Sequence, residues 1–284
     1  MKELTSFEDR LVALGGTVSV WCGRPGDSAA YSRLPDAIHY PASTMKVGVM
    51  AAAYRLADAG QLDLDAEVGV HDRFTSAVGG VFTMDPDYDS DPQVWDRLGD
   101  SVSLRWLIRR MIVRSSNLAT NLVLERVGYG AAQAAYRAVG DTRSITRRGI
   151  EDYAARDAGV DNEITAADLA AQLAAIHSGT MASPAACDEM LEILTAQEIT
   201  VDLATGLPEG VKAAAKNGWV TGIRHGAMIV YPDDAEPYVL VACASSPLAT
   251  SDDGDDPVCR TFGELSGLVW DARHRLGSTA TTAA

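Results

Sequence analysis

The chain has 284 residues, of which 47% are hydrophobic and 22% charged, so it can bury the core of one large domain or of two closely packed lobes. Its net charge of −15 argues against general nucleic-acid binding, because an acidic surface repels phosphate. No stretch reaches the ~18 apolar residues that suggest a membrane span, and no leader is visible at the N-terminus. We therefore expect no membrane contact and a cytoplasmic location as the sequence is written, or secretion if a leader was removed.

The predicted elements follow a simple order along the chain. A helix over residues 5–14 precedes strands at 17–22 and 29–33, which flank a turn at 24–27. Helical patterns then cover residues 43–59, which end before Gly60, and residues 104–112, 118–127 and 166–176, the last with Thr165 as N-cap. Strands return at 227–231 and 238–243 around the turn 232–237, an acidic loop covers 251–257, and a helix near 259–275 precedes a tail expected to fray from Gly277.

This order predicts an α/β (α+β) fold, with an antiparallel sheet built from both ends of the chain and flanked by helices, plus an all-helical lobe. We expect one catalytic domain over 1–284, with an α/β lobe at about 1–42 and 200–284 and an all-α lobe at about 43–199. A cleft between two such lobes is a usual place for an active site.

Cysteine and histidine give no metal-binding pattern. The four cysteines, Cys22, Cys187, Cys243 and Cys259, have neither zinc-site nor Cys-x-x-Cys spacing, so we expect buried structural thiols without a disulfide framework. The five histidines lack metal-ligand spacing. No Gly-x-Ser-x-Gly elbow accompanies His225, so we interpret it as a strand residue near the substrate rather than the base of a Ser-His-Asp triad.

The first candidate motif is Ser43-Thr-Met-Lys46, at the start of a predicted helix. The i, i+3 spacing brings the Ser43 hydroxyl and the Lys46 amine to one helix face. A lysine desolvated in a cleft can accept the serine proton, and the helix N-terminus offers backbone N–H groups to an oxyanion. Taken alone, the pattern is more typical of a capping serine followed by a surface lysine.

Two further motifs follow on predicted elements of their own. Ser115-Ser-Asn117 lies at a corner between two helices, where the Ser115 hydroxyl could relay a proton and the Asn117 amide could hold a substrate carbonyl or the lysine. Lys216-Asn-Gly218 lies on a probable strand, where Lys216 could hold a carboxylate and Gly218 admits close approach to the backbone. Alone, these patterns equally fit a capped helix start and a strand with an exposed lysine.

Together and in this order, the three motifs resemble the Ser-x-x-Lys, Ser-Asp-Asn and Lys-Thr-Gly set of the class A β-lactamase and penicillin-binding serine hydrolase superfamily. The resemblance covers about residues 10–275. It implies acylation of Ser43, Lys46 as base or proton relay, and Ser115 as proton donor to the leaving group. It also implies an oxyanion hole from the N–H groups of Ser43 and of a residue near Val220, no metal or organic cofactor, and a small acyl substrate, a β-lactam or similar, as partner. Lys216 and Asn217 would hold an acidic group of the substrate with help from Arg224.

Three departures from the family pattern bear on turnover. Ser116 stands where Asp is usual, and Asn217 stands where Thr or Ser is usual. The glutamate that activates the deacylating water in class A enzymes has only an approximate counterpart in Glu151, with Asp157, Asp161 and Glu163 as weaker candidates. Without such a base the acyl-enzyme would be long-lived.

Three functions therefore stay open at this stage. The first is hydrolysis of the amide bond of β-lactams or related acyl compounds, which would connect the protein with antibiotic resistance and penicillin binding. The second is a cytoplasmic serine esterase or amidase of the same fold, as in related glutaminases. The third is a non-catalytic penicillin-binding or sensor domain. A carboxylate that faces Ser43 favours turnover, and an apolar loop disfavours it. The oligomeric state is open as well.

Overall fold

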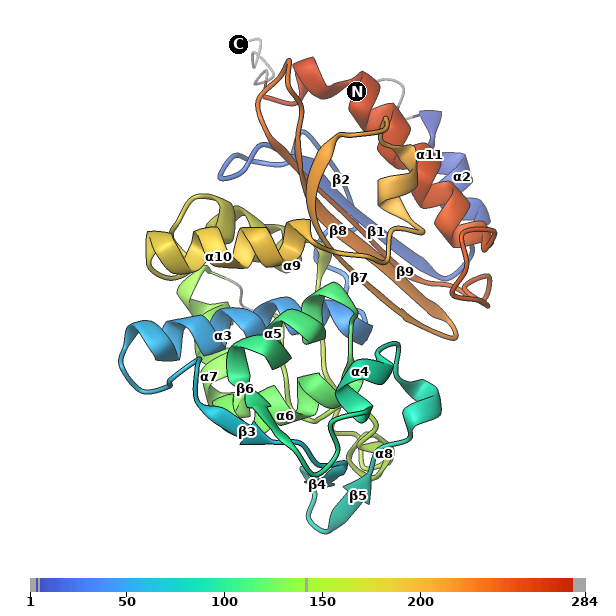
Figure 1. Ribbon diagram of the computed structural model, residues 1–284. Helices are drawn as coiled ribbons and strands as arrows, with labels where there is room; N and C mark the ends of the chain where they lie inside the picture. The colour runs from blue at the N-terminus through green and yellow to red at the C-terminus, as the bar shows by residue number, and fades with distance from the viewer. Residues whose placement is uncertain (1–3, 5, 141–142, 278–284) are drawn as a thin grey trace.

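The computed structural model describes residues 4, 6–140 and 143–277. A five-stranded antiparallel sheet has the order β2-β1-β9-β8-β7 and is built from both ends of the chain, as predicted (Figure 1). Its strands are β1 Thr17–Gly23, β2 Tyr31–Arg33, β7 Lys212–Val220, β8 Ile223–Tyr231 and β9 Tyr238–Ser245. The predicted hairpin is thus confirmed, and the strand that carries Lys216 forms the outer edge beyond it.

The segment between the two parts of the sheet is mainly helical. Its helices are η1 Ala42–Met45, α3 Lys46–Asp58, η2 Pro86–Tyr88, α4 Pro92–Trp95, α5 Leu104–Val113, α6 Asn117–Val127, α7 Tyr129–Ala138, α8 Tyr153–Asp157, α9 Ala166–His177, α10 Pro184–Thr195 and η3 Leu203–Gly206. This lobe also holds two small antiparallel ladders that the sequence did not predict, one between β3 Glu67–Gly69 and β6 Ser101–Ser103, the other between β4 Arg73–Thr75 and β5 Val81–Thr83. Strands of three residues are too short to give a periodic signal.

The terminal helices cover one face of the sheet. These are α2 Glu8–Ala13, at the N-terminal end, and α11 Pro257–Asp271, followed by the turn η4 Arg273–Arg275 (Figure 1). The predicted first helix begins at residue 5, which lies outside the described residues, as does the tail beyond Gly277. Among the described residues, no helix combines the length and apolar character needed to cross a bilayer.

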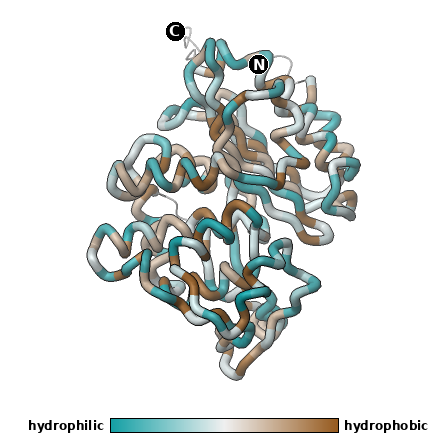
Figure 2. Tube along the Cα trace, in the orientation of Figure 1, coloured by the Kyte–Doolittle hydropathy of each residue, from teal (hydrophilic) through white to brown (hydrophobic). Residues whose placement is uncertain are grey.

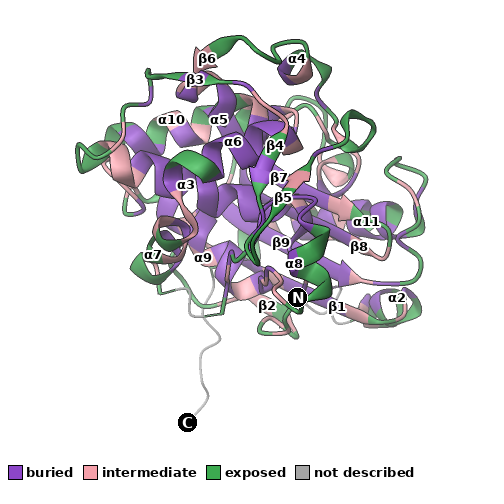
Figure 3. Ribbon diagram, turned by 90° about the horizontal axis from the view of Figure 1, so that it is seen from below, coloured by how far each residue is buried: buried purple, intermediate pink, exposed green. Residues whose placement is uncertain are grey.

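Alternation along β9 explains how the sheet serves two cores. Val239, Val241 and Cys243 pack with α3, α5, α9 and α10, whereas Leu240 and Ala242 pack with α2 and α11. Figure 2 shows hydrophobic stretches along the sheet strands and the inner sides of the helices. Figure 3 shows α3 and the large sheet in the buried interior, while β4, β5 and α8 are largely exposed.

Several local predictions are confirmed. The Thr165 side chain accepts from the Asp168 N–H at 3.0 Å and caps α9, and Gly60, with φ +67°, ends α3. All four cysteines are free and buried, and burial raises the pKa of the Cys22, Cys243 and Cys259 thiols to about 12.

Candidate active site

A cavity of about 440 Å³ lies where η1 and the corner before α6 meet the edge strand β7. Predicted site residues in its wall are Ser43, Ser115, Asn117, Asn217, Gly218, Val220 and Arg224. Lys46 and Lys216 lie beneath this wall with fully buried side chains that reach Ser115. Three segments far apart in the sequence therefore meet at one place.

The helix that carries Ser43 begins as a tight 3-10 turn and continues as α3 from Lys46. Ala42, just before the nucleophile candidate, has φ +46°, an uncommon conformation for a residue with a side chain. Ser115, with φ +58°, is another such position. Strained backbone of this kind costs of order 1–3 kcal/mol and concentrates at functional sites.

Lys46 is held by the second motif. Its Nζ donates to the Ser115 carbonyl at 2.6 Å, to Asn117 Oδ1 at 2.9 Å and toward Ser115 Oγ at 3.3 Å. Burial lowers the pKa of Lys46 to about 7, against the opposing charges of Asp89 and Glu151. Near neutral pH a substantial share of Lys46 is therefore the free amine, which can accept a proton.

Ser115 Oγ lies between two lysines. It is 3.3 Å from Lys46 Nζ and 3.1 Å from Lys216 Nζ. Burial, and then the charge of Lys46, lower the pKa of Lys216 well below its ordinary value. A hydroxyl in contact with two amines can pass a proton from one to the other or to a group bound in the cavity.

Gly218 is where β7 passes closest to η1. A Cβ atom at Gly218 would lie 2.8 Å from the Ser43 nitrogen and 3.0 Å from the Pro41 carbonyl oxygen. Glycine is therefore required for the strand edge to approach the nucleophile backbone.

The register of β7 and β8 bears on the second oxyanion donor. The two-residue turn at 221–222 makes Val220 and Ile223 the closing pair, and in such a ladder hydrogen-bonded and non-bonded pairs alternate. The Val220 N–H therefore faces β8, whereas the N–H of Trp219 points to the free edge of β7. The pairing favours Trp219 over the expected position near Val220.

Asp89 is a site residue that the motifs did not predict. Its Oδ2 accepts from Ser116 Oγ at 3.1 Å and from the Leu118 N–H at 2.8 Å, so a carboxylate from another segment anchors the corner where Ser116 replaces the family's Asp. Among the charges acting on Lys46, that of Asp89 is the largest. No sequence motif surrounds Asp89, and only its distance in space reveals it.

His225 supports the nucleophile segment from below. Its Nε2 lies 2.7 Å from the Tyr40 carbonyl oxygen, and its Nδ1 lies 2.8 Å from the Arg224 carbonyl oxygen. Burial lowers the pKa of His225 to about 4, and burial with the charge of His225 lowers that of His39 to about 3. His225 contacts the main chain three residues before Ser43 and makes none of the contacts of a triad base.

The loop that carries Glu151 forms the remaining wall, but Ile150 faces the cavity. Asn121 clamps Ile150 from both sides, since its Oδ1 accepts from the Ile150 N–H at 2.8 Å and its Nδ2 donates to the Ile150 carbonyl at 2.9 Å. Ile150 lines the cavity, and among the described residues Glu151 is not part of that lining. Glu151 has φ +62°, and its Oε2 accepts from the Asp85 N–H at 2.9 Å.

The Glu151 carboxyl is nevertheless close enough to the site to influence it. Burial raises its pKa, the Asp85 N–H opposes that rise, and the charge of Lys46 also lowers it. Its Oε1 is buried and has no hydrogen-bond partner among the described residues. The group thus interacts with the charge of Lys46, lies outside the cavity lining and is bonded to the Asp85 N–H.

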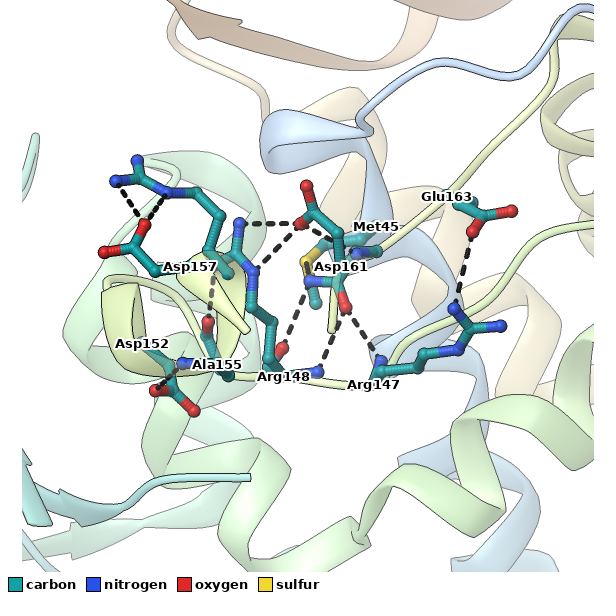
Figure 4. Close-up of polar contacts among 11 residues, drawn as sticks. Met45, Arg147, Arg148, Asp152, Ala155, Asp157, Asp161 and Glu163 are labelled. Carbon is teal, nitrogen blue, oxygen red and sulfur yellow. Dashed lines mark hydrogen bonds and ion pairs between the residues drawn. The ribbon is translucent and has the colours of Figure 1, made fainter. Parts of the chain in front are cut away.

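The other carboxylates of this loop form ion pairs with arginines of the same segment. Figure 4 shows Asp161 paired with Arg148, at 2.8 Å, and Glu163 reaching Arg147 from the opposite side. Asp157 pairs with Arg156 at 3.2 Å in exposed positions. The three weaker candidates for a deacylation base are therefore engaged in ion pairs within the loop.

A family model described as "Beta-lactamase enzyme family" matches residues 4–272. The chain belongs to the β-lactamase enzyme family. It is accordingly an enzyme of the active-site serine hydrolase type, as the resemblance implied. No curated protein matches the sequence.

Solved structures show the same fold at low identity. The β-lactamase from Sphaerobacter thermophilus is 22% identical with a TM-score of 0.79, and the match covers 95% of this chain and 97% of that one. An ancestral class A β-lactamase is 24% identical with a TM-score of 0.76, covering 95% and 98%. A mutant of PBP-A, solved as an acyl-enzyme complex with penicillin G, is 20% identical with a TM-score of 0.79, covering 97% and 98%.

Proposed function

We propose that this chain is a serine acyl hydrolase in which Ser43 is acylated by β-lactams or related acyl compounds, and in which the acyl-enzyme is released slowly. The observation that carries the first half is the contact of Ser115 Oγ with both Lys46 and Lys216 beside Ser43. The observation that carries the second half is Ile150 in the cavity wall where a deacylation base would stand.

Acylation uses groups already gathered at the cavity. The free amine of Lys46 takes the proton of Ser43, and Ser43 Oγ bonds to the substrate carbonyl carbon. The N–H groups of Ser43 and Trp219 stabilise the oxyanion. As the carbon–nitrogen bond breaks, Ser115 gives its proton to the leaving nitrogen and is reprotonated from the lysines. Asn117 holds Lys46 and borders the substrate. The wall that meets its other end is formed by Asn217, Gly218, Val220 and Arg224, with Lys216 beneath it.

Deacylation needs a base that takes a proton from the water as it attacks the ester carbon. Ile150 cannot accept a proton, and Glu151 is anchored on the Asp85 N–H with its backbone at positive φ. We therefore propose that Glu151 modulates the charge around Lys46 and does not activate the water. The predicted role of Glu151 as deacylation base is the part of the family mechanism that this loop supports least.

The test is intact-mass spectrometry after incubation with penicillin G and, in parallel, with its methyl ester, so that ligand charge does not decide the outcome. We expect a single covalent adduct that maps to the Ser43 peptide and decays slowly after removal of ligand. Absence of an adduct with both compounds, or an adduct on another residue, would contradict acylation of Ser43. Fast turnover without accumulation would contradict slow release.

A further inference from the structure

The Asn217 amide at the β7 end of the cavity bonds the protein itself. Its Nδ2 donates to the Ile199 carbonyl at 3.2 Å, and its Oδ1 lies 3.3 Å from Lys216 Nζ. An amide group has two donor hydrogens, and one of them has a protein acceptor here. A bound carboxylate can therefore take at most the other hydrogen of Asn217.

Lys216 is occupied in the same way. Its Nζ contacts Ser115 Oγ at 3.1 Å, the Asn217 carbonyl at 2.7 Å and Asn217 Oδ1 at 3.3 Å, so three acceptors match the three hydrogens of an ammonium. The side chain is fully buried.

Arg224 is the remaining cation of this corner, and it is covered. It pairs with Trp219 across the strands, and its Cζ lies 5.7 Å from the centroid of the Trp219 ring. It is 1% exposed, and its NH2 group donates to the Ser251 carbonyl at 2.7 Å. Its Nε is buried without a hydrogen-bond partner among the described residues, and the Trp219 ring lies against the guanidinium, so little of Arg224 is open to a ligand.

The rim adds negative charge. Asp87 and Asp252 are exposed residues of the cavity lining, from two different sides of the opening. The chain as a whole carries −15. Both features repel an approaching anion, the rim at short range and the net charge at distances that salt screens.

We infer that this cavity selects acyl compounds that carry no carboxylate at the end facing β7, that is, uncharged esters and amides or uncharged β-lactam derivatives. The inference rests on the proposed function, because it names the substrate class of the same site. It differs from the expectation that Lys216, Asn217 and Arg224 hold an acidic group. A carboxylate placed there loses hydrogen bonds to water, and the Lys216 ammonium that would replace them already has three protein acceptors.

The experiment compares acylation rates of Ser43 by penicillin G and by its methyl ester, each divided by the compound's rate of hydrolysis in hydroxide to remove intrinsic reactivity. We expect the ester to react about 10- to 100-fold faster, the factor that corresponds to one hydrogen bond to a charged group. The preference should persist at high salt, where long-range repulsion is screened.

Two variants separate the causes. Asn217→Thr frees Lys216 from the amide and supplies a hydroxyl donor, so it should narrow the ester preference about 10-fold, the loss of roughly one hydrogen bond. Asp252→Asn, on the rim, should change the ratio by about 2-fold and only at low salt. Continued acylation of each variant by the ester shows that it is folded and competent.

Each outcome bears on one claim. An acid that acylates the wild type as fast as the ester would overturn the inference while leaving the proposed function intact. An unchanged ratio in Asn217→Thr would overturn the assignment to Asn217. No acylation of Ser43 by either compound would instead overturn the proposed function.

Discussion

The floor of the cavity and the loop that forms one of its walls use their polar groups in opposite ways. At the floor, Lys46 and Lys216 each contact Ser115, which lines the same cavity as Ser43, so their hydrogen bonds form a path along which protons can move. In the loop that carries Ile150 and Glu151, the carboxylates accept hydrogen bonds from neighbouring segments of the protein and do not contact the proton path.

The loop contacts illustrate this use. Glu151 accepts from the Asp85 N–H at 2.9 Å, and Asp152 accepts from Ser76 Oγ and from the Ala77 N–H, both at 2.8 Å. These bonds attach the loop to the region of β4 and β5 and leave Ile150 toward the cavity. Membership of a hydrolase family therefore does not ensure both halves of its reaction, because acylation and deacylation depend on different elements of the fold.

The largest expected effect comes from removing the nucleophile at the floor. Ser43→Ala should lower acylation by about 10⁴-fold or more, because the reacting oxygen is lost and only binding remains. Adduct formation by mass spectrometry measures this. Ser90→Ala, a change at another serine of the cavity wall, is the matched control and should still be acylated. An undiminished yield of adduct in Ser43→Ala would contradict the assignment of Ser43 as the nucleophile.

The next largest effect is expected from replacing Lys46, the proposed base in acylation. Lys46→Arg keeps a cation but loses a proton acceptor at neutral pH, so acylation should fall about 10²- to 10⁴-fold. In the wild type the pKa of Lys46 is about 7, and its neutral form is the active one. The acylation rate should therefore rise as pH increases through about 7 and then level off. A rate that falls over this range would show that the protonated lysine is needed.

Two substitutions at adjacent positions test the role of the loop in deacylation. Ile150→Glu places a carboxylate in the cavity wall, and a positioned general base contributes about 10²-fold or more, so the decay of the acyl-enzyme should accelerate by about that factor. Glu151→Gln keeps the size of the neighbouring side chain and should change deacylation by less than about 3-fold, as a loss of charge outside the cavity. Pre-formed acyl-enzyme followed by mass spectrometry gives both rates. Slowed decay in Glu151→Gln with no gain in Ile150→Glu would restore Glu151 as the base.

The contribution of His225, which contacts the main chain near Ser43, can be tested through the pH dependence of protein stability. The pKa of His225 is depressed to about 4 from an ordinary 6.5, so the unfolded chain binds its proton first, and stability is lost as pH falls from about 6.5 toward 4. For this group alone the loss is about 2 kcal/mol at a pH of about 5. His225→Gln keeps a donor toward Tyr40 without titrating, so the difference between variant and wild type in denaturant midpoint should change steadily as the pH is lowered. A difference independent of pH would assign His225 a packing role only.

Much of the floor was predictable from the sequence because its parts are local. Ser43 and Lys46 are three residues apart on one helix, Ser115 and Asn117 are two apart at one corner, and β7 carries the third motif in a strand pattern. The hairpin was predictable because residues 227–231 and 238–243 are apolar runs on either side of a turn. Such local patterns indicate which face of a helix or strand carries the motif, even when the motifs are far apart in the sequence.

The loop was not predictable because its geometry depends on contacts at long range. Asn121 selects which of two adjacent residues faces the cavity, and Asp89 replaces the carboxylate missing at Ser116 from a turn 27 residues away. A glutamate next to an isoleucine carries no sign in the sequence of which one points inward. The same holds for the Asn217 amide, whose hydrogen bond to the Ile199 carbonyl arises only in the fold.

One experiment tests most directly whether a complete acylation site lies beside a loop that lacks a deacylation base. The enzyme is acylated with penicillin G methyl ester, freed of ligand, and followed by intact-mass spectrometry in parallel with Ile150→Glu. The account predicts an adduct on the Ser43 peptide that persists in the wild type and decays about 10²-fold faster in the variant. A wild-type adduct that decays as fast as that of Ile150→Glu would contradict it.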